Sequence, residues 1–379
     1  MRDVSCIFKS FSNGVKTNRD DIVYGYDRGE LKDRIKAIIE NYNSEVDRLA
    51  RHKKDIKNER ISKDNIDQFV SYRKVNWSES LKANLMRGKY ADTFAETALR
   101  PSLYRPYAKK WLYFDPMLNE RRYQYPRIFP TLETEKENRV ICVSGLGTAK
   151  PFDCLAAREI TELQILGNSQ SFPFYIYNEN GANRRENVTD WALGQFREHY
   201  RDKRISKWDI FYYVYGILHH PAYGTKYADN LRRELPRIPY APDFKAFSKA
   251  GAKLAQWHLE YGQIEPYKFK FIEAKDHPLS YHVNDKMRLS KDKKSLMVNP
   301  SLTLSGIPAE TFGYRPGNRS ALEWVIDQYQ VKTDKQSGIR SDPNRPDDPE
   351  YIVRLVGQVI QVSLETVKIV DSLPKDFGG

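Results

Sequence analysis

The sequence predicts an α+β protein in which mixed sheets of short strands pack against helices, with a long N-terminal helix and a C-terminal helix. The first observation is a helical spacing of apolar residues from Glu30 onward, and the second is the run 348–370, which favours a final helix. The third is the stretch from Leu99 to Tyr177. There, short aromatic or β-branched runs are bounded by Gly, Pro and Asn, as strands usually are.

The N-terminal part is expected to form a strand and turn over 7–26, followed by the long helix. Apolar residues three or four apart form one stripe on that helix: Leu31, Ile35, Ile38, Tyr42, Val46 and Leu49. The charged run 51–65 is typical of a solvated helix end or connector and is the best candidate for a domain boundary. We therefore divide the chain into residues 1–75 and 76–379, with a short helix expected over 78–89.

The middle of the chain is expected to pass from strands to helices. Strands are predicted at 110–115, 138–145 and 171–177. A helix then starts at a weak capping box of Ser206 and Asp209 and stops at Pro221.

A second helix is expected after Pro221. Thr225 is the predicted cap of this helix, which carries Tyr227, Leu231 and Leu235 at four-residue spacing. The prolines at 236 and 239 then force an extended chain.

The C-terminal part is expected to mix strands and capped helices. Residues 286–299 favour two strands around a lysine-rich turn. Ser320 and Glu323 form a capping box that predicts a helix start. In the final helix, Asp348 is the predicted cap and Pro349 the first-turn residue.

The composition indicates a globular chain that favours polyanions. The 379 residues are 40% hydrophobic and 30% charged, and the net charge is +12 with a pI near 9.3. Each phosphate that a Lys or Arg neutralises releases condensed counterions, so excess cations favour nucleic acid. The three cysteines are widely spaced, which suits the cytoplasm, and no apolar run reaches the ~18 to 20 residues of a membrane helix.

Tyrosine is abundant and often stands beside basic residues, as in 102–114 and 120–129. Two interpretations stay open. Aromatic rings interleaved with Arg and Lys can stack on bases or follow a phosphate backbone. The same pattern also fits a tyrosine-rich sheet with long basic side chains at its rim.

No pattern assigns a catalytic or metal-ligating residue. His219 and His220 are adjacent and diverge by about 100° on a helix, whereas a helical metal pair needs a spacing of three or four. Gly145 and Gly147 lack the third glycine of a dinucleotide turn, so a plain turn is expected. Asp243 and the run 273–275 match a nuclease layout, but the aspartate lies in a Pro-bounded loop.

Several longer blocks together resemble one family. They are residues 7–24, 104–130, 138–152, 211–239 and 307–344. In this order they resemble the C-terminal specificity region of Type ISP restriction-modification enzymes. The resemblance covers nearly the whole chain, and these blocks are far more specific than any short motif above.

The resemblance implies a place in a larger enzyme. In that family one polypeptide carries a nuclease, a helicase-like ATPase, an adenine-N6 methyltransferase and a target-recognition domain. Residues 1–75 would be the trailing edge of the methyltransferase with a helical connector, and 76–379 the target-recognition domain. The nuclease, the ATPase and the NPPY-type methyltransferase motif are missing from this sequence. No cofactor is therefore expected in this chain, while S-adenosylmethionine, ATP and Mg are expected in the full-length enzyme.

The leading hypothesis is sequence-specific recognition of double-stranded DNA by a noncatalytic chain, with the methyltransferase and helicase/nuclease domains as partners in cis or as a separate chain. Basic side chains would hold the backbone while a few polar residues read base edges. Candidate phosphate contacts are Lys109, Lys110, Arg121, Arg122 and Arg127. Candidate base readers are Asn183, Arg184, Arg185, Arg315, Asn318 and Arg319. Lys226, Arg232, Arg233 and Arg237 fit phosphate contacts and a solvated helix face equally well.

Two other classes of function stay open. The chain could be a methyltransferase or nuclease subunit with an unrecognised active site. It could also be a docking module whose basic face contacts an acidic partner domain.

Overall fold

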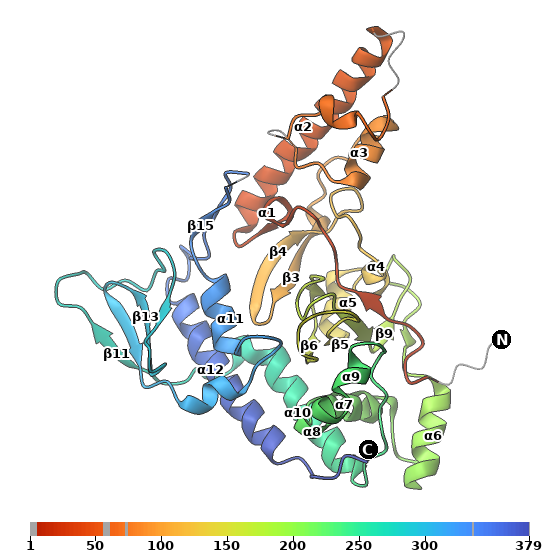
Figure 1. Ribbon diagram of the computed structural model, residues 1–379, viewed down its shortest axis with the longest axis vertical. Helices are drawn as coiled ribbons and strands as arrows, with labels where there is room; N and C mark the ends of the chain where they lie inside the picture. Colours follow the sequence, from red (N-terminus) through yellow and green to blue (C-terminus); the bar gives the residue numbers. More distant parts are fainter. Residues whose placement is uncertain (1–5, 56–60, 73–74, 336, 379) are drawn as a thin grey trace.

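The structure, a computed structural model, describes residues 6–55, 61–72, 75–335 and 337–378. Helices and small sheets pack around two hydrophobic cores in this part of the chain, which confirms the α+β class (Figure 1). Residues 56–60 of the charged connector lie outside the described residues. Segments on both sides of residue 75 contribute strands to shared sheets, and the division of the chain there stays a prediction.

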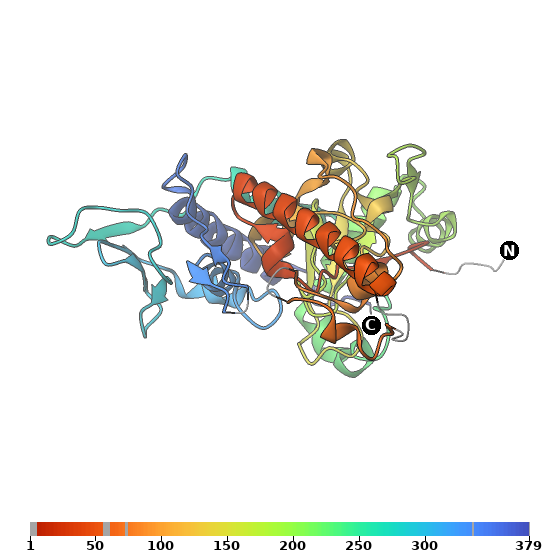
Figure 2. The same cartoon turned by 90° about the horizontal axis from the view of Figure 1, so that it is seen from above.

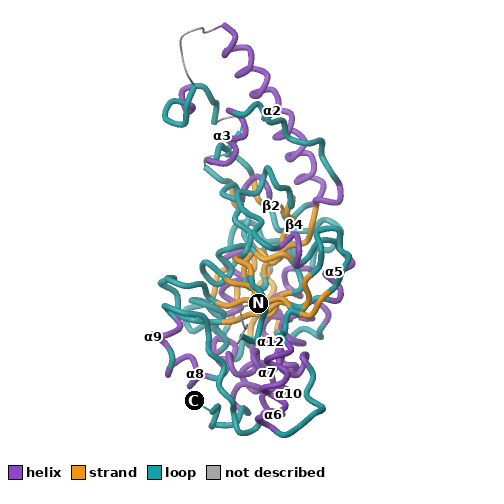
Figure 3. Tube along the Cα trace, turned by 90° about the vertical axis from the view of Figure 1, so that its right-hand side faces the viewer, coloured by secondary structure: helices purple, strands orange, loops and turns teal. Residues whose placement is uncertain are grey.

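The long N-terminal helix is confirmed as α2 (Arg28–Asp55), which projects from the body with α3 (Glu79–Met86) beside it (Figures 1 and 3). The apolar stripe faces the core, because five of its six predicted residues are buried, namely Leu31, Ile35, Tyr42, Val46 and Leu49. The sixth, Ile38, is half-buried. Ahead of α2, the expected strand and turn prove to be β1 (Ser12–Asn13), the one-turn helix α1 (Asp20–Val23) and β2 (Tyr24–Gly25). Two aspartates in the first turn of α1 favour the helical turn there.

Two four-stranded sheets form the centre of the molecule. One has the order β2-β4-β3-β7, with β3 (Leu99–Arg105), β4 (Ala108–Tyr113) and β7 (Ile160–Thr161). The other has the order β1-β8-β5-β6, with β5 (Val140–Val143), β6 (Cys154–Ala157) and β8 (Gln170–Pro173). Every residue of β5 and β6 is buried. A strand that is covered on both faces has no polar alternation, and this is why both sequences are continuously apolar.

Short elements lie in the chain between and after the strands of these sheets. They are α4 (Tyr125–Ile128), α5 (Leu132–Glu137) and the hairpin of β9 (Tyr175–Ile176) and β10 (Arg185–Glu186). The predicted strands at 110–115, 138–145 and 171–177 are thus confirmed as β4, β5 and the β8–β9 pair.

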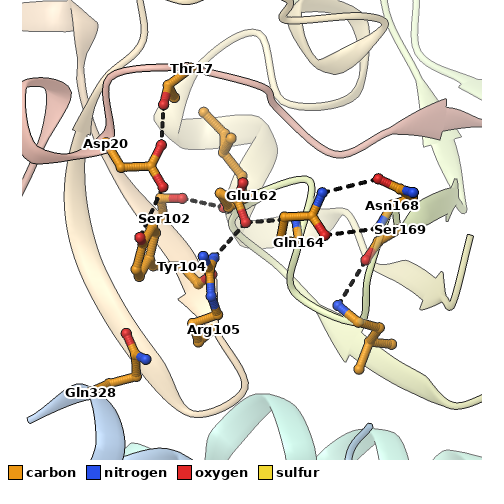
Figure 4. A network of polar contacts seen from close by, with 12 residues as sticks. Thr17, Asp20, Ser102, Tyr104, Arg105, Glu162, Gln164, Asn168, Ser169 and Gln328 are labelled. Carbon is orange, nitrogen blue, oxygen red and sulfur yellow. Dashed lines mark hydrogen bonds and ion pairs between the residues drawn. The ribbon is translucent and has the colours of Figure 1, made fainter. Parts of the chain in front are cut away.

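A polar network joins the N-terminal segment to β3 and to the loop after β7 (Figure 4). The Tyr104 hydroxyl donates to Asp20 Oδ2 at 2.9 Å, and Arg105 forms an ion pair with Glu162. Glu162 Oε2 also accepts the backbone N–H of Gln164 at 2.6 Å, and the Gln164 amide donates to Asn168. The bonds of Tyr104 with Asp20 and of Arg105 with Glu162 are half-buried, and they hold together three segments that are far apart in sequence.

Helices form a layer beneath the sheets (Figure 1). They are α6 (Asp190–Tyr200), α7 (Lys207–Leu218), α8 (Pro221–Lys226), α9 (Ala228–Leu231), α10 (Phe244–Glu260) and α12 (Tyr351–Asp371). α7 and α10 cross very closely. A Cβ added at Gly251 would lie 1.9 Å from the Tyr212 carbonyl oxygen, and one at Gly216 would lie 2.3 Å from that of Phe247.

A third four-stranded sheet stands off the body (Figures 1 and 2). Its order is β11-β14-β13-β12, with β11 (Lys270–Glu273), β12 (Arg288–Leu289), β13 (Ser295–Asn299) and β14 (Leu302–Ser305). The lysine-rich turn lies between β12 and β13, as predicted. α11 (Ala321–Gln328) and the hairpin of β15 (Lys332–Thr333) and β16 (Arg340–Ser341) follow.

The capping boxes of Ser206 with Asp209 and of Ser320 with Glu323 are confirmed, but two predicted caps are wrong. Thr225 lies inside α8, where its hydroxyl donates to the Pro221 carbonyl oxygen at 3.0 Å. The helix starts earlier because Pro221 itself occupies its first turn. Asp348 does not cap α12, since its carbonyl oxygen accepts the Tyr351 N–H in a turn that precedes the helix, and its carboxylate pairs with Arg354.

Among the helices of the described residues, none combines the length and the hydropathy that a membrane span requires.

The α7–α10 crossing yields a stability prediction. Gly251→Ala should lower the free energy of unfolding by about 3 kcal/mol, because the added methyl group meets a backbone carbonyl that cannot move without separating the helices. Gly194→Ala is the matched control, since nothing lies within 4 Å of its Cβ in α6, and it should stabilise by about 0.5–1 kcal/mol. Chemical unfolding followed by circular dichroism measures both. Equal effects of the two variants would contradict the close crossing.

Candidate nucleic-acid interface

Arg127 and Arg185 lie in one hollow of about 460 Å³, here called the Arg127 groove. Arg127 comes from α4 and Arg185 from β10, and Lys9 and Phe11 of the N-terminal segment complete the basic and aromatic lining. The backbone fixes this arrangement, since Lys9 N donates to Asn187 O at 2.8 Å and Tyr177 N donates to Arg127 O at 2.9 Å. Both arginine side chains are exposed, and the ion pairs of the described residues include neither of them.

The candidates that stand close to Arg127 and Arg185 in sequence do not line this groove, and they differ in whether their side chains already have partners. Arg121 is exposed, and its backbone pairs in both directions with Lys16 at 2.9 Å. Arg122 is half-buried over the Phe114 ring. Asn183 occupies an exposed turn in the left-handed region that asparagine tolerates, with φ of 57°. Arg184 pairs with Glu137 at 2.5 Å and lies over the Tyr175 ring, so its charge already has a partner.

A second hollow, of about 790 Å³, adjoins the Arg127 groove, because Lys9 and Phe11 line both. Arg233 and Arg237 line its far side, and exposed Trp191 contributes an aromatic ring. Arg237 is 85% exposed although it pairs with Glu234 at 2.8 Å. The Lys9–Phe11 segment therefore lies between two pairs of arginines.

The loop 315–319 holds the remaining candidates. Arg315, Asn318 and Arg319 line a hollow of about 520 Å³ with Lys286. Arg319 pairs with Asp327 at 2.6 Å and lies over the Trp324 ring, so it serves the local structure of α11. Arg315 Nη2 donates to the Asn318 carbonyl oxygen at 2.9 Å, and the Asn318 side chain is exposed.

A cavity of about 710 Å³ connects this loop to α9, because Arg315 and Arg232 both line it. Arg232 is 73% exposed, and its guanidinium forms a long ion pair with Asp229, at 3.8 Å. Arg233 follows directly and lines the hollow beside Lys9. Each hollow shares a lining residue with the next, namely Arg315, Leu218, and Lys9 with Phe11, so we group the four as the cationic band, from loop 315–319 through α9 to the Arg127 groove.

Lys109 and Lys110 do not belong to the cationic band. The Lys109 ammonium pairs with Glu159 at 2.5 Å and lies over the Tyr261 ring. The Lys110 ammonium lies 4.2 Å from the centre of the Tyr104 ring and 4.8 Å from that of Tyr26. Burial lowers the pKa of Lys110 to about 7. For these two lysines, the structure therefore favours the second interpretation of the sequence, in which basic side chains lie at the rim of a tyrosine-rich sheet, over contact with DNA. Lys226 is exposed near Tyr227 and Phe377.

Sequence reasoning missed Lys9 and Phe11, which link the two arginine pairs. They stand two residues apart in a stretch that the sequence predicts as a strand, where alternate residues share one face, and that spacing was the available signal.

The short motifs prove to be structural. His219 Nδ1 lies 2.8 Å from the Tyr215 carbonyl oxygen, so it carries the proton, and burial lowers the pKa of His219 to about 4. That nitrogen is also 3.3 Å from Cys154 Sγ, but a protonated nitrogen cannot accept the thiol proton, so the pair does not form a nucleophile and base. Asp243 caps α10 by accepting the Ala246 N–H at 2.9 Å. A Cβ at Gly145 would lie 1.7 Å from the Asn168 carbonyl oxygen, so this glycine serves packing.

Within the described residues, no group of three or more His, Cys, Asp and Glu side chains has an arrangement that could hold a metal ion.

Comparisons with known proteins point to one family. The model of the Type ISP C-terminal specificity domain matches residues 6–355. No curated protein matches the chain. Among solved structures, a nuclease-deletion mutant of the Type ISP restriction-modification enzyme LlaGI in complex with a DNA substrate mimic is 31% identical over 99% of this chain, with a TM-score of 0.85. The DrdV–DNA complex is 36% identical over 98%, with a TM-score of 0.84, and the ATP-dependent Type ISP enzyme LlaBIII bound to DNA is 28% identical over 99%, with a TM-score of 0.84.

The chain spans only part of these relatives, covering 28% of the LlaGI chain, 36% of the DrdV chain and 24% of the LlaBIII chain. The family model nevertheless matches nearly all of the present chain. The chain therefore belongs to the Type ISP C-terminal specificity domain family.

Proposed function

We propose that this chain recognises a specific sequence in double-stranded DNA, as the noncatalytic specificity part of a Type ISP restriction-modification enzyme. The observation that carries the proposal is the cationic band, in which exposed arginines from distant segments line adjoining hollows. Its relatives LlaGI, DrdV and LlaBIII were all solved with DNA or a DNA mimic, which supports the same ligand here.

Phosphate contacts and base contacts would come from different parts of the band. Lys9, Arg127 and Arg185 place three positive charges around one hollow, which suits the repeated phosphates of a DNA backbone. Arg315 and Asn318 stand on a short loop at the other end. Guanidinium and amide groups pair in bidentate fashion with guanine and adenine edges, so this loop is the better reader of sequence.

The rest of the enzyme belongs to the proposal as well. The methyltransferase and the helicase and nuclease domains would be supplied by the parent polypeptide or by a separate chain. S-adenosylmethionine, ATP and Mg would bind those domains, and the complex would act in the cytoplasm. Residues 1–75 would form the junction with the methyltransferase.

The phosphate contacts predict a change in salt dependence. Replacing Arg127 and Arg185 together by alanine should reduce the slope of log K against log salt by about 0.9 for each phosphate that is no longer neutralised. Duplex binding at several salt concentrations, measured by fluorescence anisotropy, gives the slope. Replacing Lys203 and Arg204 by alanine removes the same charge outside the band and serves as the control. An equal slope change in both double variants would show a diffuse charge effect instead of a DNA contact.

The loop predicts a change in sequence discrimination. Asn318→Ala should cost about 1–3 kcal/mol of preference for the target over a scrambled duplex, because alanine cannot make the bidentate hydrogen bond to a base, while binding to the scrambled duplex stays the same. The target is first selected from a randomised duplex library with the unaltered chain. Asn284→Ala, an exposed amide outside the band, is the control. Unchanged discrimination in Asn318→Ala would remove this residue from base reading.

A further inference from the structure

The loop 315–319 is held in place from the side of the β5–β6 connection. Asp153 Oδ2 accepts the backbone N–H of Gly317 at 2.7 Å, across 164 residues of sequence. Its other oxygen, Oδ1, accepts the N–H of Cys154 at 2.7 Å, where β6 begins. Gly317 has a φ of +83°, a conformation that favours glycine, so the loop has its sharpest turn at the tethered residue.

A second tether comes from α11. The indole Nε1 of Trp324 donates to the Pro316 carbonyl oxygen at 2.7 Å, and this hydrogen bond is buried. Residues 316 and 317 are thus fixed by groups from two different elements. On either side of these two anchored residues, the side chains of Arg315 and Asn318 reach the surface of the loop.

Asp153 is an unusual carboxylate. The ion pairs of the described residues include none to Asp153, and its hydrogen-bond partners are the two backbone N–H groups. Tyr107, Tyr215 and Tyr314 lie near it, and Cys154 follows it in the chain. Burial raises the pKa of Asp153 to about 7. Asp153 is half-buried, and a carboxylate that is partly withdrawn from water without a cation beside it opposes folding. Such local conflicts concentrate at functional sites.

We propose that Asp153 is a positioning residue for target recognition, which holds loop 315–319 in the shape that presents Arg315 and Asn318 to base edges. The inference rests on the proposed function and adds to it the group that orders the reading loop. A loop that is already ordered before binding loses less conformational freedom when it meets the DNA, so its base contacts discriminate more strongly. Asp153 itself faces the 710 Å³ cavity and need not touch DNA.

Asp153→Asn tests the tether without changing the size of the side chain. Each carboxylate oxygen of Asp153 accepts one backbone N–H group. The asparagine side chain has only one oxygen, so it can accept one of these N–H groups, and its NH₂ group must face the second N–H group without a hydrogen bond. The neutral amide also removes a half-buried charge that opposes folding, and this gain should offset the lost hydrogen bond, so the melting temperature should change little. Asp371→Asn is the matched control, because Asp371 is an exposed acid that lines the same cavity, and the hydrogen bonds and ion pairs of the described residues include none between it and loop 315–319.

Two measurements are made on the full 379-residue chain. At pH 8, above the pKa of about 7 of Asp153, hydrogen exchange of residues 313–320 should become about tenfold faster in Asp153→Asn, as expected for the loss of one charge-assisted hydrogen bond, and should not change in Asp371→Asn. The affinity ratio between the library-selected duplex and a scrambled duplex should fall about tenfold in Asp153→Asn, while affinity for the scrambled duplex stays constant.

Other outcomes separate this inference from the proposed function. Unchanged exchange in residues 313–320 would overturn the tether. Faster exchange with unchanged discrimination would overturn the positioning role and leave DNA recognition standing. Failure of the unaltered chain to discriminate any duplex would instead refute the proposed function, and the reading role of the loop with it.

A second variant removes the other hydrogen bond that holds the loop, the one from Trp324 to Pro316. Trp324→Phe keeps an aromatic ring and removes the indole N–H that Pro316 accepts. If ordering of the loop is what matters, this variant should also speed exchange at 313–320 and lower discrimination, with no change in charge. Discrimination that falls in Asp153→Asn but not in Trp324→Phe, despite faster exchange in both, would contradict the positioning role.

Discussion

The close crossing of α7 and α10 is the constraint on which the rest of the structure depends. Gly216 and Gly251 each face a backbone carbonyl of the other helix, so the two helices approach to a distance that no side chain would permit. α10 also packs against α12 and β6, and α7 belongs to the second hydrophobic core. Through this one crossing the helical layer acquires a fixed position relative to the central sheets.

A buried chain of hydrogen bonds depends on that position. The Tyr215 hydroxyl on α7 receives the Ala156 N–H of β6 at 2.8 Å and lies 2.6 Å from His258 Nδ1 on α10. His258 Nε2 lies 2.9 Å from the Thr366 hydroxyl on α12. Since buried polar groups need partners, these bonds fix the register of four elements at once. β6 begins directly after Asp153, so the same framework sets where the carboxylate meets loop 315–319.

The N-terminal segment has a comparable role on the opposite side. Residues 8–16 form backbone pairs with Val188, β8, Glu162 and Arg121, four places that are distant in sequence. Lys9 and Phe11 are carried on this segment and lie between the arginines of α4 and β10 and those that follow α9. The cationic band is therefore built on extended and irregular chain that is held at many points, an arrangement in which a rigid scaffold presents variable loops to a ligand.

The sequence by itself determined the α+β class, the stripe of α2, two capping boxes and the lysine-rich hairpin, because these features depend on neighbours within a few residues. The long blocks at 7–24 and 307–344 likewise sufficed to indicate the family. Only the tertiary structure decided which candidates lie together. It placed Lys110 beside the Tyr26 and Tyr104 rings and paired Arg319 with Asp327 of α11. It also brought Arg127 and Lys9 to one hollow and Asp153 to Gly317. Spacing along a chain cannot reveal these last two pairs, because contacts across more than a hundred residues arise from packing and not from local periodicity.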